Sequence, residues 1–103
     1  PNAASDQTIV SPDITLSQNR PNPFNPETTI SYKLKNESRV ELIIYNIKGQ
    51  KIKTLVSESQ KAGFHSILWN GTDNQGDKVS SGVYFYRIDT GHEQQIRKML
   101  LLK

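Results

Sequence analysis

The chain has 103 residues, the length of a single domain, and contains no cysteine, which excludes disulfide bridges and cysteine-based metal sites. Its 13 Lys and Arg residues against 10 Asp and Glu residues give a net charge of +3, and the basic residues are spread along the chain. Because nucleic-acid-binding domains concentrate basic residues in a stripe, no nucleic acid partner is expected.

Residues 1–13 are polar, include two prolines and show little periodicity, as in an interdomain linker. The chain begins at Pro1 rather than at a methionine, so we expect this linker to follow a missing upstream domain. Runs with the composition of β-strands begin at Ile14, and the folded domain is therefore expected to occupy residues 14–103. The first run, residues 14–17, is compatible with an edge strand.

The region from residue 21 to residue 34 combines a proline-rich segment with a clear strand pattern. Three prolines within residues 21–26 exclude both a helix and a central strand. Phe24 is the one large apolar residue there, and we expect it to close one end of the core. Residues 28–34 alternate cleanly, with Ile30, Tyr32 and Leu34 on one face, which predicts a half-buried strand.

Further strand-like runs fill the rest of the chain, separated by turns rich in Gly, Asn and Ser; they are residues 39–45, 50–57, 64–69, 83–89 and 94–102. This spacing predicts an all-β fold, an immunoglobulin-like antiparallel β-sandwich of about seven strands. The predicted core consists of apolar residues that share a face: Phe24, Ile30, Tyr32, Leu42, Ile67, Trp69, Tyr84 and Tyr86. The glycines assigned to turns are Gly49, Gly63, Gly71 and Gly82.

Residues suited to catalysis are few. His65 alternates with apolar residues and is predicted to pack within a strand, and His92 falls in a turn. No nucleophile motif, phosphate loop or pair of carboxylates with acid–base spacing is present. We therefore expect no enzyme, no catalytic residue, no cofactor and no small-molecule substrate.

Residues 73–77 (DNQGD) have oxygen side chains around a glycine, as calcium loops do. However, Gln75 stands where a carboxylate is needed, and no acidic residue closes the far end of the loop. Asp, Asn and Gly are also the commonest turn residues, so a plain turn without a metal is predicted.

The last run ends in four apolar residues, from Met99 to Leu102, that occupy both faces of the strand. A wholly buried strand would explain them, and so would an edge strand that docks a partner through unpaired backbone groups. Met99 and Leu101 are expected to touch the core, with Leu100 and Leu102 pointing outward.

The chain also resembles a known family in six segments that occur in order: LSQNRPNPFNP (16–26), TTISY (28–32), YNIKGQ (45–50), AGFHSILWNG (62–71), SGVYFYR (81–87) and KMLLLK (98–103). These resemble the type A C-terminal sorting domains of type IX secretion cargo in the Bacteroidetes, which are related to the immunoglobulin-like domain of the flagellar hook-capping protein. Asn70-Gly71 replaces the Asp-Gly of many relatives.

The resemblance implies a sorting signal rather than a catalytic activity. Such a domain is recognised by the outer-membrane type IX secretion machinery, and a sortase-like peptidase then often removes it from the secreted or cell-surface cargo after transit through the periplasm. The implied recognition residues are Lys98, Met99, Leu100, Leu101, Leu102 and Lys103. A monomer is expected.

Two other roles are compatible with the sequence: an immunoglobulin-like structural spacer and a carbohydrate-binding module of a secreted protein. Carbohydrate platforms display exposed aromatic rings, whereas Trp69, Tyr84 and Tyr86 are predicted to point inward, which disfavours the second role.

Overall fold

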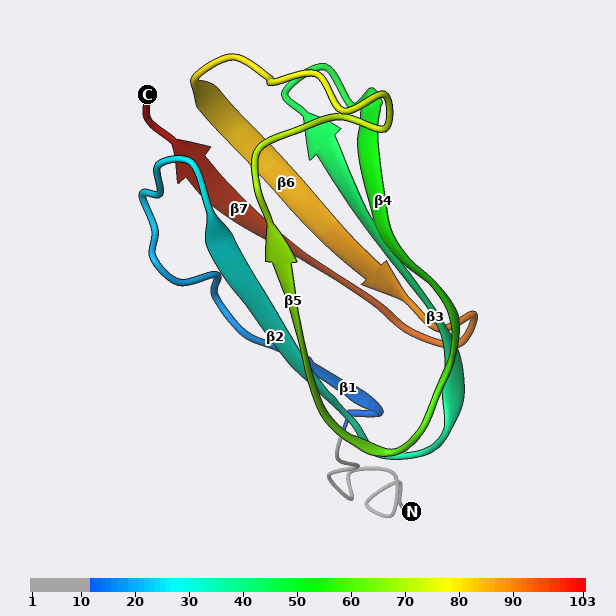
Figure 1. The fold of residues 1–103 in the computed structure, drawn as a ribbon. Helices are drawn as coiled ribbons and strands as arrows, with labels where there is room; N and C mark the ends of the chain where they lie inside the picture. The colour runs from blue at the N-terminus through cyan, green and yellow to red at the C-terminus, as the bar shows by residue number, and fades with distance from the viewer. Residues whose placement is uncertain (1–11) are drawn as a thin grey trace, which may run out of the picture.

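The computed structural model describes residues 12–103, which form two antiparallel sheets packed face to face (Figure 1). The three-stranded sheet has the order β1 (Ile14–Leu16), β2 (Thr28–Leu34), β5 (Gly63–Trp69). The four-stranded sheet has the order β4 (Lys51–Gln60), β3 (Ser38–Asn46), β6 (Gly82–Asp89), β7 (Gln94–Leu101). The predicted immunoglobulin-like sandwich is thus confirmed, whereas most of the expected linker, residues 1–11, lies outside the described residues.

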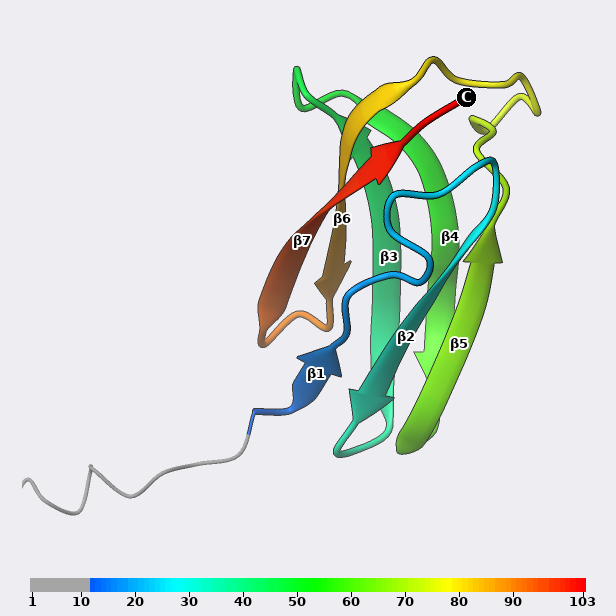
Figure 2. The same ribbon diagram turned by 90° about the vertical axis from the view of Figure 1, so that its left-hand side faces the viewer.

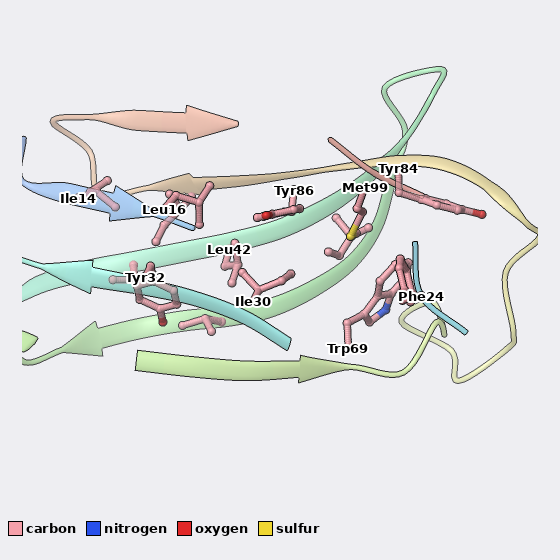
Figure 3. Close-up of a cluster of buried hydrophobic side chains, with 14 of the residues drawn as sticks. Ile14, Leu16, Phe24, Ile30, Tyr32, Leu42, Trp69, Tyr84, Tyr86 and Met99 are labelled. Atoms are coloured by element: carbon pink, nitrogen blue, oxygen red, sulfur yellow. The ribbon is translucent and has the colours of Figure 1, made fainter. Parts of the chain in front are cut away.

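The core lies between the two sheets and is built by period-two alternation along each strand. In β2, for example, Ile30, Tyr32 and Leu34 are buried while Ser31 and Lys33 face outward. Aromatic rings gather at one end of the sandwich (Figure 3), where the Trp69 ring packs against both Phe24 and Tyr84. All the predicted core residues are buried except Ile67, which packs against the core but stays partly exposed because β5 is an edge strand.

Strand β4 continues to Gln60, beyond the expected end at residue 57, and two irregularities interrupt its pairing with β3. The register shifts between Leu42 and Ile43 and again between Ile44 and Tyr45. Each shift adds a residue to β4, so apolar residues do not alternate regularly along it. Ile52 and Leu55 nevertheless pack against the core.

The four glycines assigned to turns all have positive φ: 81° at Gly49, 121° at Gly63, 77° at Gly71 and 151° at Gly82. Gly71 has a second constraint, since a Cβ there would lie 3.2 Å from the Pro26 carbonyl oxygen. The absence of a side chain at Gly71 thus allows the proline-rich segment to pack close to the chain just after β5. Within residues 12–103, no helix is long and apolar enough to cross a membrane.

Candidate functional site

The candidate recognition residues, 98–103, form the end of β7 and the two residues beyond it. Met99 and Leu101 are buried against the core, whereas Leu100 is half-buried and Leu102 is 48% exposed. Lys98 and Lys103 are exposed. The segment therefore anchors itself with alternate side chains and presents two leucines and two lysines outward.

The backbone edge of this segment is not free, although β7 is the last strand of its sheet. Phe24 N donates to the Leu100 carbonyl at 3.0 Å, and Leu102 N donates to the Phe24 carbonyl at 3.0 Å. Leu100 N donates to Asn22 Oδ1 at 3.0 Å, and the Lys98 carbonyl accepts from Gln18 Nε2 at 2.8 Å. Of the two explanations offered for this segment, the one that requires unpaired backbone groups is therefore contradicted at Lys98, Leu100 and Leu102.

The proline-rich segment supplies this cover for a clear reason. Pro21, Pro23 and Pro26 have no N–H group and cannot continue a strand ladder. Phe24 lies between them and keeps both of its backbone groups, so it forms a single parallel bridge to Leu101 while its ring enters the core. One residue thus closes the end of the core and the end of the β7 edge.

Farther along β7, β1 lies beside the same edge (Figure 2), and side chains of β7 bond to its backbone. Gln95 accepts from Leu16 N at 3.0 Å and donates to the Ile14 carbonyl at 2.6 Å. Arg97 Nε donates to the Leu16 carbonyl at 2.7 Å. These bonds let two strands of different sheets lie side by side without forming a ladder.

Tyr86 makes a buried link to the segment that follows β1. Its hydroxyl donates to the Ser17 carbonyl at 2.7 Å and accepts from Asn19 N at 2.8 Å. Burial raises the pKa of Tyr86 to about 12, although the Asn19 N–H and the nearby Arg97 cation act in the opposite direction. Sequence reasoning assigned Tyr86 to the core but missed the bonds of its hydroxyl to Ser17 and Asn19, because these partners lie more than sixty positions away.

The aromatic residues offer no flat external platform. Trp69 is fully buried, and its Nε1 donates to the Thr72 carbonyl at 2.8 Å. Its ring lies 5.7 Å from Phe24 and 5.6 Å from Tyr84, centroid to centroid. Trp69, Tyr84 and Tyr86 therefore cannot stack on a sugar at the surface.

The polar residues considered for chemistry make structural contacts. His65 stacks on Tyr32 with ring centroids 5.4 Å apart, and its Nε2 is 2.8 Å from the Lys61 carbonyl. Asp73 Oδ1 accepts from Gln75 N and Asp77 N at 2.9 and 3.0 Å, which is the role of aspartate in a turn. In the part of the chain that the structure describes, no three His, Cys, Asp or Glu residues gather as a metal site.

The comparisons with known proteins agree with this architecture. Residues 18–93 match the family model described as the FlgD Ig-like domain. No curated protein sequence is similar enough to count as a match.

Among solved structures, latent dimeric PorU from Porphyromonas gingivalis is similar at 21% identity with a TM-score of 0.70, over 90% of this chain and 10% of PorU. PorZ, an essential surface component of the type IX secretion system of the same organism, is similar at 18% identity and TM-score 0.60, over 84% of this chain and 11% of PorZ. FlgD from Xanthomonas campestris, a hook-capping protein, is similar at 20% identity and TM-score 0.58, over 84% of this chain and 64% of FlgD. The chain thus spans about a tenth of PorU and PorZ, and at these identities the likeness concerns the fold.

Proposed function

The chain belongs to the FlgD Ig-like domain family, and from that premise we propose that it is a sorting domain that directs an exported bacterial protein through the type IX secretion system. In this role the domain has no catalytic activity and acts as a folded sorting signal at the C-terminal end of its cargo. PorZ, a surface component of the type IX secretion system, contains a part of similar fold, as does PorU of the same organism, which supports the proposal.

The observation that carries the proposal is the outward display of Leu100 and Leu102 beside Lys98 and Lys103. Because Phe24 and Asn22 already bind the backbone of Leu100, a receptor would recognise the side chains of this segment rather than add a strand to the edge of β7. The covered edge also keeps the segment in one conformation before it is recognised, which lowers the entropy cost of binding. Residues 98–103 are the proposed recognition site.

The position of this segment suits such a role. The described chain enters at Pro12 at one end of the sandwich and leaves at Lys103 at the other (Figure 1). An upstream cargo domain would therefore leave the terminal segment accessible. The same end-to-end geometry suits a structural spacer, which is the second candidate function, and the experiment below separates the two.

The test is export of a passive reporter fused between a signal peptide and residues 14–103, in a cell that has the type IX apparatus. The wild-type fusion is expected outside the cell. A variant with Leu100→Lys and Leu102→Lys is expected to stay in the periplasm, since it removes the outward apolar groups without touching Met99 or Leu101. Deleting residues 98–103 would be less informative, because it removes buried side chains and unfolds the domain.

The matched control carries Phe64→Lys and Leu68→Lys, which replace two exposed apolar residues on the outer face of β5. It should be folded by circular dichroism and exported like wild type. Equal export of the folded Leu100/Leu102 variant would refute recognition through these side chains. Retention of the wild-type fusion in the periplasm would refute the sorting role and leave the spacer.

A further inference from the structure

The outer face of the four-stranded sheet carries an unusual group of residues: Tyr45, Ile47, Phe85, Arg87 and Ile96, which we name the Arg87 patch. Solvent-facing sides of antiparallel sheets are normally polar. Here Ile47 and Ile96 are 73% and 58% exposed, and the five residues line a shallow depression of about 430 Å³. They come from β3, β6, β7 and the β3–β4 turn.

The strand register explains why these residues meet. Ile43 of β3 pairs with Arg87 of β6, which pairs with Ile96 of β7. The adjacent row joins Tyr45, Phe85 and Lys98. Val40, Leu42 and Ile44 face the core, so Ile43 faces outward, yet it is only 4% exposed. Neighbouring side chains on the outer face therefore cover Ile43 almost completely.

Arg87 is a cation without an anion in this setting. Its guanidinium carbon lies 5.1 Å from the centroid of the Tyr45 ring. Its Nε is buried and has no hydrogen-bond partner within residues 12–103, and no described carboxylate lies within ion-pair distance of it. A buried donor without an acceptor is costly, and guanidinium groups bind carboxylates through two parallel hydrogen bonds.

We propose that the Arg87 patch is a docking surface for a partner protein segment that carries a carboxylate between apolar side chains. The apolar side chains would cover Tyr45, Phe85 and Ile96, and the carboxylate would bind the guanidinium, with Lys98 and Lys51 adding positive charge along the neighbouring row. This inference goes beyond export, because it concerns binding by the folded domain whatever its destination.

Charge argues against a second copy of the chain as the occupant. A two-fold axis that passes close to Arg87 would bring this cation beside the same cation of the other copy. Like charges brought together at an interface oppose association. The charge of the patch is instead complementary to an acidic segment.

The test uses the isolated chain and fluorescent peptides in which one glutamate lies between aliphatic and aromatic residues, with matched peptides that carry glutamine instead. Fluorescence anisotropy is expected to show binding of glutamate peptides at least about tenfold tighter than their glutamine counterparts. Arg87→Met should abolish that difference, and Ile96→Ser should weaken both peptide sets.

The chain offers matched controls on the opposite sheet. Lys33 Nζ lies 5.2 Å from the centroid of the Phe64 ring, so Lys33→Met also removes a cation that lies over an aromatic ring. Leu68, at 53% exposure, matches Ile96, so Leu68→Ser removes a comparable apolar side chain. Neither control should change binding, and all variants should melt close to wild type.

Three results would overturn the proposal. The first is equal binding of glutamate and glutamine peptides, or no binding up to about 1 mM peptide. The second is an unchanged glutamate preference in Arg87→Met. The third is a dimer of the wild-type chain in solution that Ile96→Ser converts to a monomer, which would assign the patch to a second copy.

Discussion

Replacing Trp69 by alanine tests whether the aromatic end of the sandwich holds the two sheets together. The side chain is fully buried between Phe24 and Tyr84, and its N–H group binds the Thr72 carbonyl. Removing a large buried aromatic side chain lowers the free energy of unfolding by about 3–5 kcal/mol, and the unpaired carbonyl adds about 1 kcal/mol. Because domains of this size are stable by about 5–15 kcal/mol, Trp69→Ala should lose a large share of its stability.

The assay is urea and thermal denaturation followed by circular dichroism. About 1 kcal/mol corresponds to roughly 4–8 °C for a domain of this length, so Tm should fall by at least about 12 °C. Trp69→Phe is the graded control: it keeps an aromatic ring but loses the N–H group, and it should cost about 1–2 kcal/mol. A Trp69→Ala melt within about 2 °C of wild type would show that the side chain is exposed and would restore the carbohydrate-binding role. Acrylamide quenching provides an independent check, since Trp69 is the only tryptophan and should be shielded.

Two further predictions concern the polar contacts. Tyr86→Phe should lower the free energy of unfolding by about 1–2 kcal/mol and speed amide exchange at Asn19, because the Ser17 carbonyl and the Asn19 N–H lose their partner. The pKa of tyrosine is 10.0 ordinarily and about 12 for Tyr86 in the folded chain, so the stability that the neutral Tyr86 hydroxyl contributes is complete below pH 10 and is lost as the pH rises through the folded value. Wild type should therefore lose more stability than Tyr86→Phe over that pH range. Parallel plots of unfolding free energy against pH for the two proteins would contradict this account. Asp73→Ala should cost about 1 kcal/mol, since Gln75 N and Asp77 N lose their acceptor. Calcium at about millimolar concentration should leave the Tm of wild type unchanged; a rise that a chelator reverses and Asp73→Ala abolishes would indicate a metal site.

Several features were predictable because they depend on local chemistry. The alternation of residues 28–34 gave the bounds of β2 correctly, and it placed Ile30 and Tyr32 in the core. Prolines in 21–26 correctly excluded a central strand there. Where the local pattern was less clear, the prediction was weaker: residues 50–57 were expected as a strand, but β4 runs to Gln60. Its last residues, Glu58, Ser59 and Gln60, are polar and show no apolar alternation, yet they pair with β3.

The candidate site shows the limit of such reasoning. The sequence was enough to show that Met99 and Leu101 alternate with Leu100 and Leu102, and hence that one pair could be buried while the other is displayed. It did not show that Phe24 and Asn22 would cover the backbone of Leu100, since those residues lie more than seventy positions earlier. It also did not reveal the Arg87 patch, because Tyr45, Phe85 and Ile96 each look like an ordinary outward residue within its own strand.

The amino-acid sequence by itself therefore determined the turns and the apolar face of the strands that alternate regularly, because period-two burial and backbone preferences act between near neighbours. Only the tertiary structure decided which strands pair, which edge is covered and which outward residues meet. Those outcomes depend on contacts between distant segments, such as Gln95 with Ile14 or Arg87 with Tyr45, that no local preference encodes. The proposed recognition site and the proposed docking surface both arise from this second set of contacts.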